Sequence, residues 1–292
     1  VPTSLSNLSW QAFIGDVVPS TKRARVFGMR NRITQGVGLF TTILTGLLIT
    51  QFSEAGAWPY EVMFSLACGI GMIEAWYLFK IIEPAPRVLI DVHPLSESLR
   101  AVFRERRFLI FAAASSLFHF GWQMAWPLFN IYQVSSQYAN MSAAWVSIIT
   151  VCNGLASVLT YRMWGRLADR IGHGWTLCIG TAGLGISPLL YALSMNLYML
   201  AALNLWMGMF VACTVQTLFN RVLEVSPQEN RAFFIAMHSL FIGITAIIAP
   251  QFGVWVMSMS SMNGGFVAST VLRLLGTVAL GLVVVWERRR SF

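Results

Sequence analysis

One segment of the sequence carries polar and aromatic residues at a spacing that could bind a small molecule. Five of them follow one another at intervals of 3, 4, 3 and 4 residues: Ser116, His119, Gln123, Trp126 and Asn130. These intervals place them on one face of a helix. Trp122 lies beside this stripe, and Pro127 would bend the helix toward its outer end. The stripe suits a solute with both apolar and hydrogen-bonding parts. The alternative is ordinary hydrogen bonding between helices.

Other residues add little chemistry to this stripe. Asn153 and Gln216 are the two further polar residues that we retain as candidates for substrate binding, and His119 is the only stripe residue that can change its charge near neutral pH. The four cysteines stand singly in apolar runs, and no pairing of nucleophile and base or of metal ligands is visible. We therefore expect no enzymatic activity, no metal and no cofactor.

The composition places these residues in a membrane. Of 292 residues, 56% are hydrophobic and only 11% are charged, whereas a soluble domain carries roughly a quarter charged residues. So few charges cannot cover a surface that faces water, so the lipid bilayer is the expected surrounding. The basic residues lie in the gaps between apolar stretches rather than on a soluble face, which argues against a nucleic-acid partner.

The apolar stretches predict an all-α membrane protein. About 20 mainly apolar residues cross the hydrocarbon core as a helix, and in lipid the backbone must satisfy its own hydrogen bonds. Eight stretches qualify: 33–52, 59–82, 107–133, 142–163, 175–194, 197–221, 232–257 and 265–286. A ninth, incomplete stretch occupies 1–15.

The positive charges predict the orientation. All but one of the 20 Lys and Arg residues lie at alternate connections between these stretches or at the C-terminus. An excess of Lys and Arg marks the cytoplasmic side. We therefore expect a multi-pass protein of a plasma membrane, specifically a bacterial inner membrane, with a cytoplasmic C-terminus.

An internal repeat predicts how the helices are grouped. Two sets of residues match at a constant offset of 208 positions: Asp16, Pro19 and Arg23 in the first copy, and Glu224, Pro227 and Arg231 in the second. In each copy an acid and a proline end one helix, and an arginine opens the next. The repeat unit is then six helices in parallel orientation. The expected parts are 1–82, the last three helices of the first unit; 83–106, a cytoplasmic connecting loop; and 107–292, the complete second unit. Three helices of the first unit are expected to be absent.

A short motif between the predicted helices 142–163 and 175–194 carries a family resemblance. It reads Gly165-Arg166-Leu167-Ala168-Asp169-Arg170-Ile171-Gly172 and is similar to the cytoplasmic loop signature of the major facilitator superfamily. The resemblance covers the chain as helices 4 to 12 of a twelve-helix transporter fold and makes the stripe part of the cavity-lining helix 7. It implies that Gly165, Asp169, Arg170 and Gly172 form a latch with the helix that begins near Arg30. A solvated loop that only sets the topology is the alternative.

The resemblance also implies a function. A member of this family would move a small solute across the membrane by alternating access, as a secondary transporter, and H⁺ is one candidate coupling ion. A non-transporting relative that acts as a sensor or membrane partner protein is the alternative.

Two charged residues lie inside predicted spans: Glu74 and Arg273. Lys80 could form an ion pair with Glu74. The resemblance places Glu74 and Arg273 on peripheral helices, where a scaffold role is expected.

Overall fold

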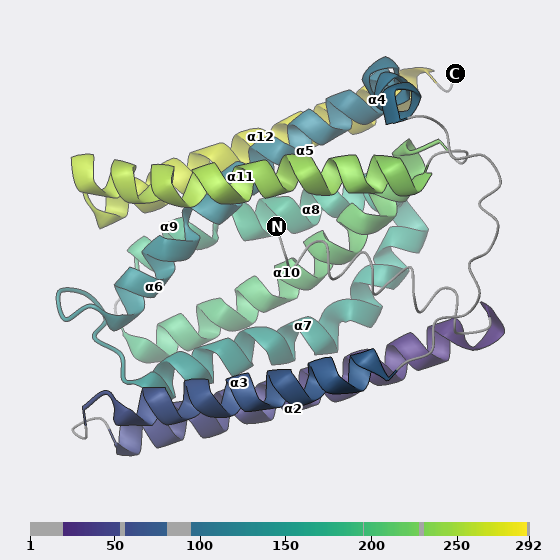
Figure 1. Cartoon of the computed structure of the whole chain (residues 1–292). Helices are drawn as coiled ribbons and strands as arrows, with labels where there is room; N and C mark the ends of the chain where they lie inside the picture. The colour runs from purple at the N-terminus through teal and green to yellow at the C-terminus, as the bar shows by residue number, and fades with distance from the viewer. Residues whose placement is uncertain (1–19, 53–55, 81–94, 195, 228–230, 291–292) are drawn as a thin grey trace. The chain divides into compact units, whose positions relative to one another are not determined.

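The computed structural model describes residues 20–52, 56–80, 95–194, 196–227 and 231–290. All regular secondary structure within these ranges is helical, so the all-α prediction is confirmed for them (Figure 1). Among the described residues, seven helices are long and apolar enough to cross a membrane. An eighth apolar segment, Gly36–Gln51, is shorter and coincides with the first predicted span.

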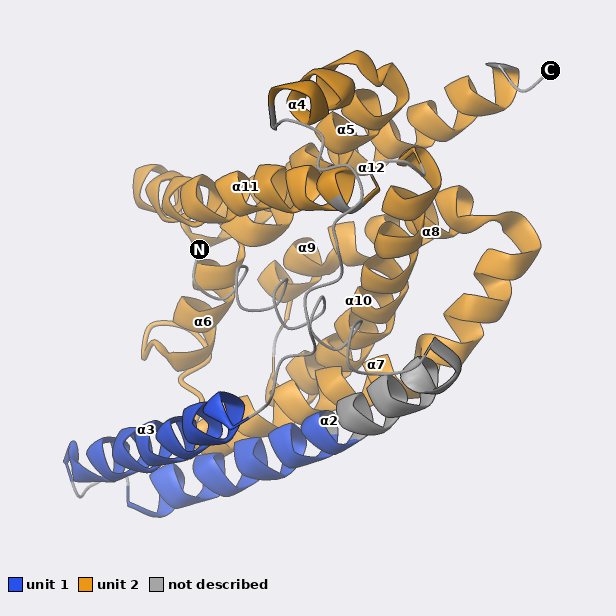
Figure 2. Cartoon of the chain, turned by 45° about the vertical axis from the view of Figure 1, so that its right-hand side comes forward, with its two compact units in different colours: residues 1–92 blue, residues 93–292 orange. Residues whose placement is uncertain are grey.

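The chain divides into two compact units, residues 1–92 and 93–292 (Figure 2). The first contains α2 (Ser20–Gln51) and α3 (Trp58–Phe79). The rings of Phe52 and Trp58 meet edge to face at the turn between these helices, with their centroids 5.5 Å apart. Nearly every side chain of α3 is exposed, because two helices alone cannot bury each other's apolar surface.

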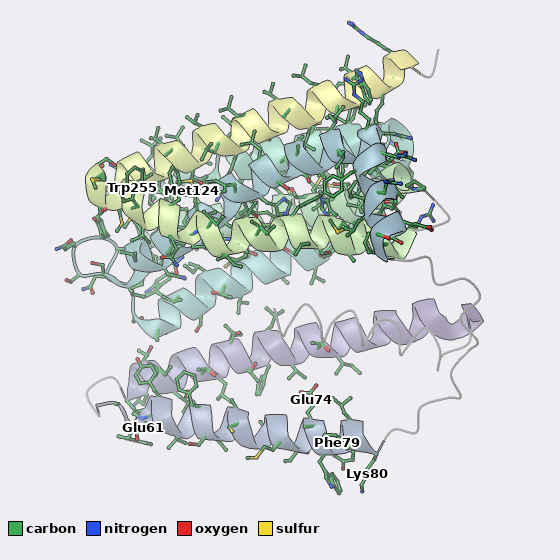
Figure 3. All side chains as sticks on the ribbon, turned by 45° about the horizontal axis from the view of Figure 1, so that its top comes forward. Glu61, Glu74, Phe79, Lys80, Met124 and Trp255 are labelled. Atoms are coloured by element: carbon green, nitrogen blue, oxygen red, sulfur yellow. The ribbon has the colours of Figure 1, made fainter. Side chains whose placement is uncertain are left out.

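The pairing of Glu74 with Lys80 is not formed. Both side chains are exposed, and they leave α3 on different sides (Figure 3). The Lys80 ammonium lies 3.7 Å from the centroid of the Trp76 ring instead. Residues 76 and 80 are one helical turn apart and share a face, whereas residues 74 and 80 do not.

The second unit contains the remaining described helices. They are α4 (Leu95–Arg104), α5 (Arg106–Met124), α6 (Trp126–Val134), α7 (Ala143–Ile171), α8 (His173–Gly185), α9 (Ser187–Ala192), α10 (Leu197–Val225), α11 (Arg231–Met259) and α12 (Met262–Arg290). Six of the predicted spans match these bounds within a few residues at most ends. The connection at 83–106 contains α4, so the prediction of a loop throughout this range is wrong for its second part.

Two of the predicted spans are each built from two helices. Pro127 and Pro188 stand in the first turn of α6 and α9. A proline has no N–H to continue the hydrogen bonding of the preceding helix, and its ring crowds the carbonyl four residues earlier. The predicted bend at Pro127 is confirmed. The second break, between α8 and α9, was not predicted.

The second unit has two chemically different ends. One end gathers the starts of α5 and α8 with the ends of α10 and α12. Eight of the residues that line a cavity at this end are Arg or Glu. The other end gathers the connections after α6, α9 and α11, where Tyr132, Ser194 and Asn263 line a second cavity that contains no basic residue. We call the first the arginine-rich end. The alternation of charge expected from the sequence is therefore present in this unit.

The helix ends that carry the proposed repeat are described only in part. In the second copy α10 ends at Val225, Pro227 follows, and Arg231 is the first residue of α11. This agrees with the local prediction. Asp16 and Pro19 lie outside the described residues, as does the side chain of Arg23. The six-helix repeat stays a prediction.

Close backbone approaches hold the helices of this unit together. A Cβ atom on Gly276 of α12 would lie 2.6 Å from the backbone of Phe118 on α5. A Cβ atom on Gly208 of α10 would overlap the carbonyl of Asn153 on α7. Small residues allow helices to approach closely in lipid, where packing replaces the hydrophobic effect as the force of association.

Candidate binding site on α5 and α6

The predicted stripe runs along α5 and continues across the break into α6. His119 and Gln123 are buried, with 6% and 4% of their surface exposed. Beyond the break, Trp126 and Asn130 are exposed. The hydroxyl oxygen of Ser116 is buried and has no hydrogen-bond partner among the described residues. The stripe thus offers both buried and accessible polar groups along one helical path.

His119 presents one ring nitrogen to a fixed partner. Its Nδ1 lies 2.8 Å from the backbone carbonyl oxygen of Ser115. A carbonyl oxygen only accepts, so Nδ1 carries the hydrogen and Nε2 of the neutral ring is an acceptor. The Trp122 ring lies 5.5 Å from the imidazole, centroid to centroid, and the Phe118 ring 5.8 Å. His119 is therefore held by its backbone contact and flanked by two aromatic rings.

A second histidine meets the same turn of α5. His238 of α11 is buried, and its Nε2 lies 2.9 Å from the hydroxyl of Ser115. The Phe111 ring stacks on the His238 ring at 5.7 Å. Ser115 thus contacts two imidazoles, one through its carbonyl and one through its hydroxyl. Neither His238 nor Ser115 was among the substrate-binding residues expected from the sequence.

The stripe has another contact with α11. The Thr245 hydroxyl donates to Oε1 of Gln123 over 2.6 Å. The Gln123 amide nitrogen has no hydrogen-bond partner among the described residues. A Cβ atom on Gly253 of α11 would overlap the backbone carbonyl of Met124, the last residue of α5. Thr245 follows His238 by seven residues, which is two helical turns, so this periodicity could have identified the face of α11 that meets the stripe.

Asn153 and Gln216 belong to a different pair of helices, α7 and α10. Next to Asn153, the Ser157 hydroxyl donates to the carbonyl of Gly208 over 2.7 Å. The Gln216 amide oxygen is buried without a partner among the described residues. A Cβ atom on Gly165 would lie 3.1 Å from the Gln216 amide nitrogen. Their role in substrate binding stays a prediction.

The motif predicted as a latch is mostly helical. Gly165, Asp169 and Arg170 lie within α7, and only Gly172, with φ of +88°, makes the turn into α8. The expectation that Gly165 lies in the loop between the predicted helices 142–163 and 175–194 is wrong. Asp169 is exposed and forms no hydrogen bond or ion pair with a described residue. The side chain of Arg30 lies outside the described residues, so the latch stays a prediction.

Arg273 of α12 is completely buried behind the stripe. Its guanidinium donates to three backbone carbonyls: Gly121 and Trp122 near the end of α5, at 3.2 Å each, and Leu184 at 2.9 Å near the end of α8. Ser269 donates to the Gly121 carbonyl as well, over 2.7 Å. These contacts fit the expected scaffold role. They hold the backbone beside Trp122 and Gln123.

Comparisons with known proteins agree with this architecture. The model of the Major Facilitator Superfamily matches residues 111–291, well over half of the chain. A probable peptide/nitrate transporter of Arabidopsis thaliana is 27% identical over 139 residues, which cover 43% of this chain and 28% of that protein. The Arabidopsis protein Zinc Induced Facilitator 1 is 31% identical over 99 residues, 34% of this chain and 20% of that protein.

The chain spans less than a third of the length of these curated relatives. Both are plant proteins, so the comparisons give no support to the expected bacterial inner membrane. The family match nevertheless covers the stripe from Ser116 to Asn130, the motif at Gly165–Gly172 and Arg273. This chain belongs to the major facilitator superfamily.

Proposed function

We propose that this chain is part of a secondary transporter that moves a small solute by alternating access. The observation that carries the proposal is the polar stripe that continues across the break between α5 and α6. Discontinuous helices with polar groups near the membrane midplane form the substrate sites of many secondary transporters. Partly unsatisfied polar groups are costly in lipid and are a sign of function there.

The chemistry of the stripe favours an organic solute over a simple inorganic anion. His119 offers a ring nitrogen, Gln123 an amide nitrogen and Ser116 a hydroxyl. Trp122 and Trp126 offer apolar faces. Each of these groups can contact one part of a solute that carries both amide or hydroxyl groups and apolar surface. Between the two substrates in the relative's name, peptide and nitrate, a small peptide matches this mixture better.

The proton is the coupling ion that we propose. A proton that binds Nε2 of His119 leaves the Nδ1–H bond to Ser115 intact and places the positive charge beside the Trp122 ring, where a cation–π contact stabilises it. His238 is the titratable group that faces it from α11. On α12, the guanidinium of Arg273 already donates to backbone carbonyls. The charged side chains of α4 and α10 lie toward the arginine-rich end.

The orientation that we propose follows from the same charges. The arginine-rich end faces the cytoplasm, because Lys and Arg are retained on that side during insertion. The C-terminus would then be cytoplasmic. Residence in the plasma membrane is part of the same proposal.

The test is transport by the full chain in proteoliposomes, with a labelled dipeptide and labelled nitrate as probes. We expect saturable dipeptide uptake that an inward proton gradient increases. His119→Ala and Gln123→Ala should each reduce uptake at least tenfold, whereas Gln251→Ala should not, since Gln251 is an exposed residue of α11. His119→Asn should remove the response to the gradient.

Three results would count against the proposal. Uptake that does not saturate would argue against a carrier. Unchanged saturable uptake in both alanine variants would overturn the assignment of the site. A gradient response that persists in His119→Asn would overturn His119 as the proton acceptor while leaving the carrier in place.

A further inference from the structure

A cavity of about 730 Å³ opens at the arginine-rich end of the second unit. It is lined by the start of α5, the start of α8 and the ends of α10 and α12. The cavity lies at the opposite end of these helices from the loops after α6 and α9, and no stripe residue lines it. It is therefore separate from the candidate substrate site.

Two helix N-termini in the wall of this cavity lack side-chain caps. The residue before α5 is Glu105 and the residue before α8 is Gly172, and neither accepts a capping hydrogen bond through a side chain. The first turns of both helices contain no acidic residue. The first N–H groups of a helix and its dipole attract anions. Both termini therefore add positive potential to the cavity.

Arginine side chains add full charges to this potential. Five arginines and three glutamates line the cavity. Two of the arginines are already neutralised: Glu287 pairs with Arg107 and Arg221, and Glu224 also pairs with Arg221. Arg104 and Arg106 are exposed and form no ion pair with a described residue. They flank the start of α5, so their charge adds to that of the helix terminus.

A histidine supplies one more polar atom without a hydrogen-bond partner. His173 is the first residue of α8, and its Nδ1 is buried without a hydrogen-bond partner among the described residues. Its Nε2 lies 3.9 Å from a carboxylate oxygen of Glu224. An unsatisfied buried nitrogen is unfavourable, and an oxygen atom of a ligand in the cavity could satisfy it.

Some residues that line the cavity are typical of the membrane interface. Trp175 and Trp286 line it beside the arginines, and tryptophan is enriched where headgroups meet the hydrocarbon core. Basic pockets between transmembrane helices at this level suit lipid headgroups. Guanidinium groups match the geometry of phosphate oxygens, with two hydrogen bonds to each group.

From these observations we propose that the cavity binds a phosphate group, supplied by the headgroup of an anionic membrane lipid. The lipid source rests on the proposed cytoplasmic orientation of the arginine-rich end, because the cytoplasmic leaflet is the one rich in anionic lipid. The phosphate contacts would come from Arg104, Arg106 and the first turn of α8. The acyl chains would lie along the outer surfaces of the neighbouring helices.

Native mass spectrometry of the full chain in detergent tests this proposal. Phosphatidylglycerol, which is anionic, and phosphatidylcholine, which is zwitterionic, are titrated separately. The affinity for the first phosphatidylglycerol should fall about tenfold or more when Arg104→Gln and Arg106→Gln are combined, since both charge-assisted contacts are lost. The affinity for phosphatidylcholine should not change. The matched control combines Arg162→Gln and Arg166→Gln, two exposed arginines on α7 outside this cavity, and should leave both affinities unchanged.

Competition with inorganic phosphate distinguishes a lipid headgroup from a soluble ligand as the source of the phosphate group. If millimolar inorganic phosphate displaces the first phosphatidylglycerol from the unmodified protein, the phosphate site stands and its ligand is soluble. If it does not, the lipid is the ligand. Equal losses of phosphatidylglycerol in both double variants, no loss in either, or equal affinities for the two lipids would overturn the site. The readout needs neither transport nor a defined orientation, so its failure is distinct from failure of the proposed transport.

Discussion

The guanidinium of Arg273 donates from Nη1 to the backbone carbonyl of Leu184 over 2.9 Å. In a regular helix that carbonyl would accept from the N–H of residue 188, but residue 188 is a proline without an N–H. Arg273 therefore supplies from α12 the donor that the break between α8 and α9 removes. Its other two donations reach Gly121 and Trp122, just before the break between α5 and α6.

Replacement of Arg273 by Met should destabilise the second unit. Three carbonyls would lose a donor in a region without water, and each lost bond is worth about 1 kcal/mol, so we expect a loss of about 3 kcal/mol. Thermal unfolding in detergent should begin roughly 5–10 °C lower, given the usual relation between free energy and melting temperature. Arg289→Met, at an exposed site of α12, is the control and should change little.

The link to Pro188 can be tested by itself. Pro188→Ala restores an N–H that can donate to the Leu184 carbonyl, so the penalty of Arg273→Met should be smaller by about 1 kcal/mol when both changes are combined. Additive effects in this double-mutant cycle would show that Arg273 does not substitute for the missing backbone donor.

A glycine pair tests the close contact between α7 and α10. Gly208→Ala would drive its Cβ into the Asn153 carbonyl, whereas a Cβ atom on Gly243 of α11 would meet nothing within 4 Å. We expect Gly208→Ala to cost about 1–3 kcal/mol through overpacking. Gly243→Ala should be neutral or stabilising by up to about 1 kcal/mol through helix propensity. Chemical or thermal unfolding measures both, and equal effects would contradict the contact.

The spans could be predicted because their signal is local. An apolar run of about 20 residues fixes a transmembrane helix without knowledge of its neighbours, and the bounds of α10, α11 and α12 follow the predicted ranges closely. The positions of proline residues alone predicted the helix breaks less well. Pro127 and Pro188 stand at breaks, but α11 continues through Pro250. Whether a helix breaks depends on what satisfies the freed carbonyls, and Arg273 does so from a distant helix.

The residues that contact the candidate site could not be predicted either, because they belong to helices that are distant in the sequence. His238 and Ser115 are 123 residues apart, and their contact depends on how α11 lies against α5. The prediction of a loop at Gly165 was wrong because α7 continues past this residue to Ile171 and remains packed there, since Ala168 is buried. The local pattern of glycines and charges does not reveal that burial.

A buried ion pair at the arginine-rich end should contribute measurably to stability. Glu287 accepts from Arg107 over 2.7 Å and pairs with Arg221, and the side chains of Glu287 and Arg221 are 12% and 9% exposed. Glu287→Gln would leave the buried guanidinium of Arg221 with less compensation, at a cost of roughly 2 kcal/mol. Glu224, whose side chain is 39% exposed, should matter less. Glu224→Gln should cost under about 1 kcal/mol, and less at high salt. A larger loss for Glu224 than for Glu287 in thermal unfolding would contradict this order.

Cysteine labelling tests whether the two ends of the second unit face opposite sides of the membrane. Gln137 is exposed in the turn between α6 and α7, and Asp169 is exposed at the other end of α7. In a background without the four native cysteines, a maleimide that cannot cross the membrane should label Gln137→Cys in intact cells. It should label Asp169→Cys only after permeabilisation, because the arginine-rich end is proposed to be cytoplasmic. The reverse pattern would invert the proposed orientation, and labelling of both positions from the same side would mean that α7 does not cross the membrane. Since α7 contains 29 residues, about 43 Å of helix at 1.5 Å per residue, it is long enough to place the two cysteines in different aqueous compartments.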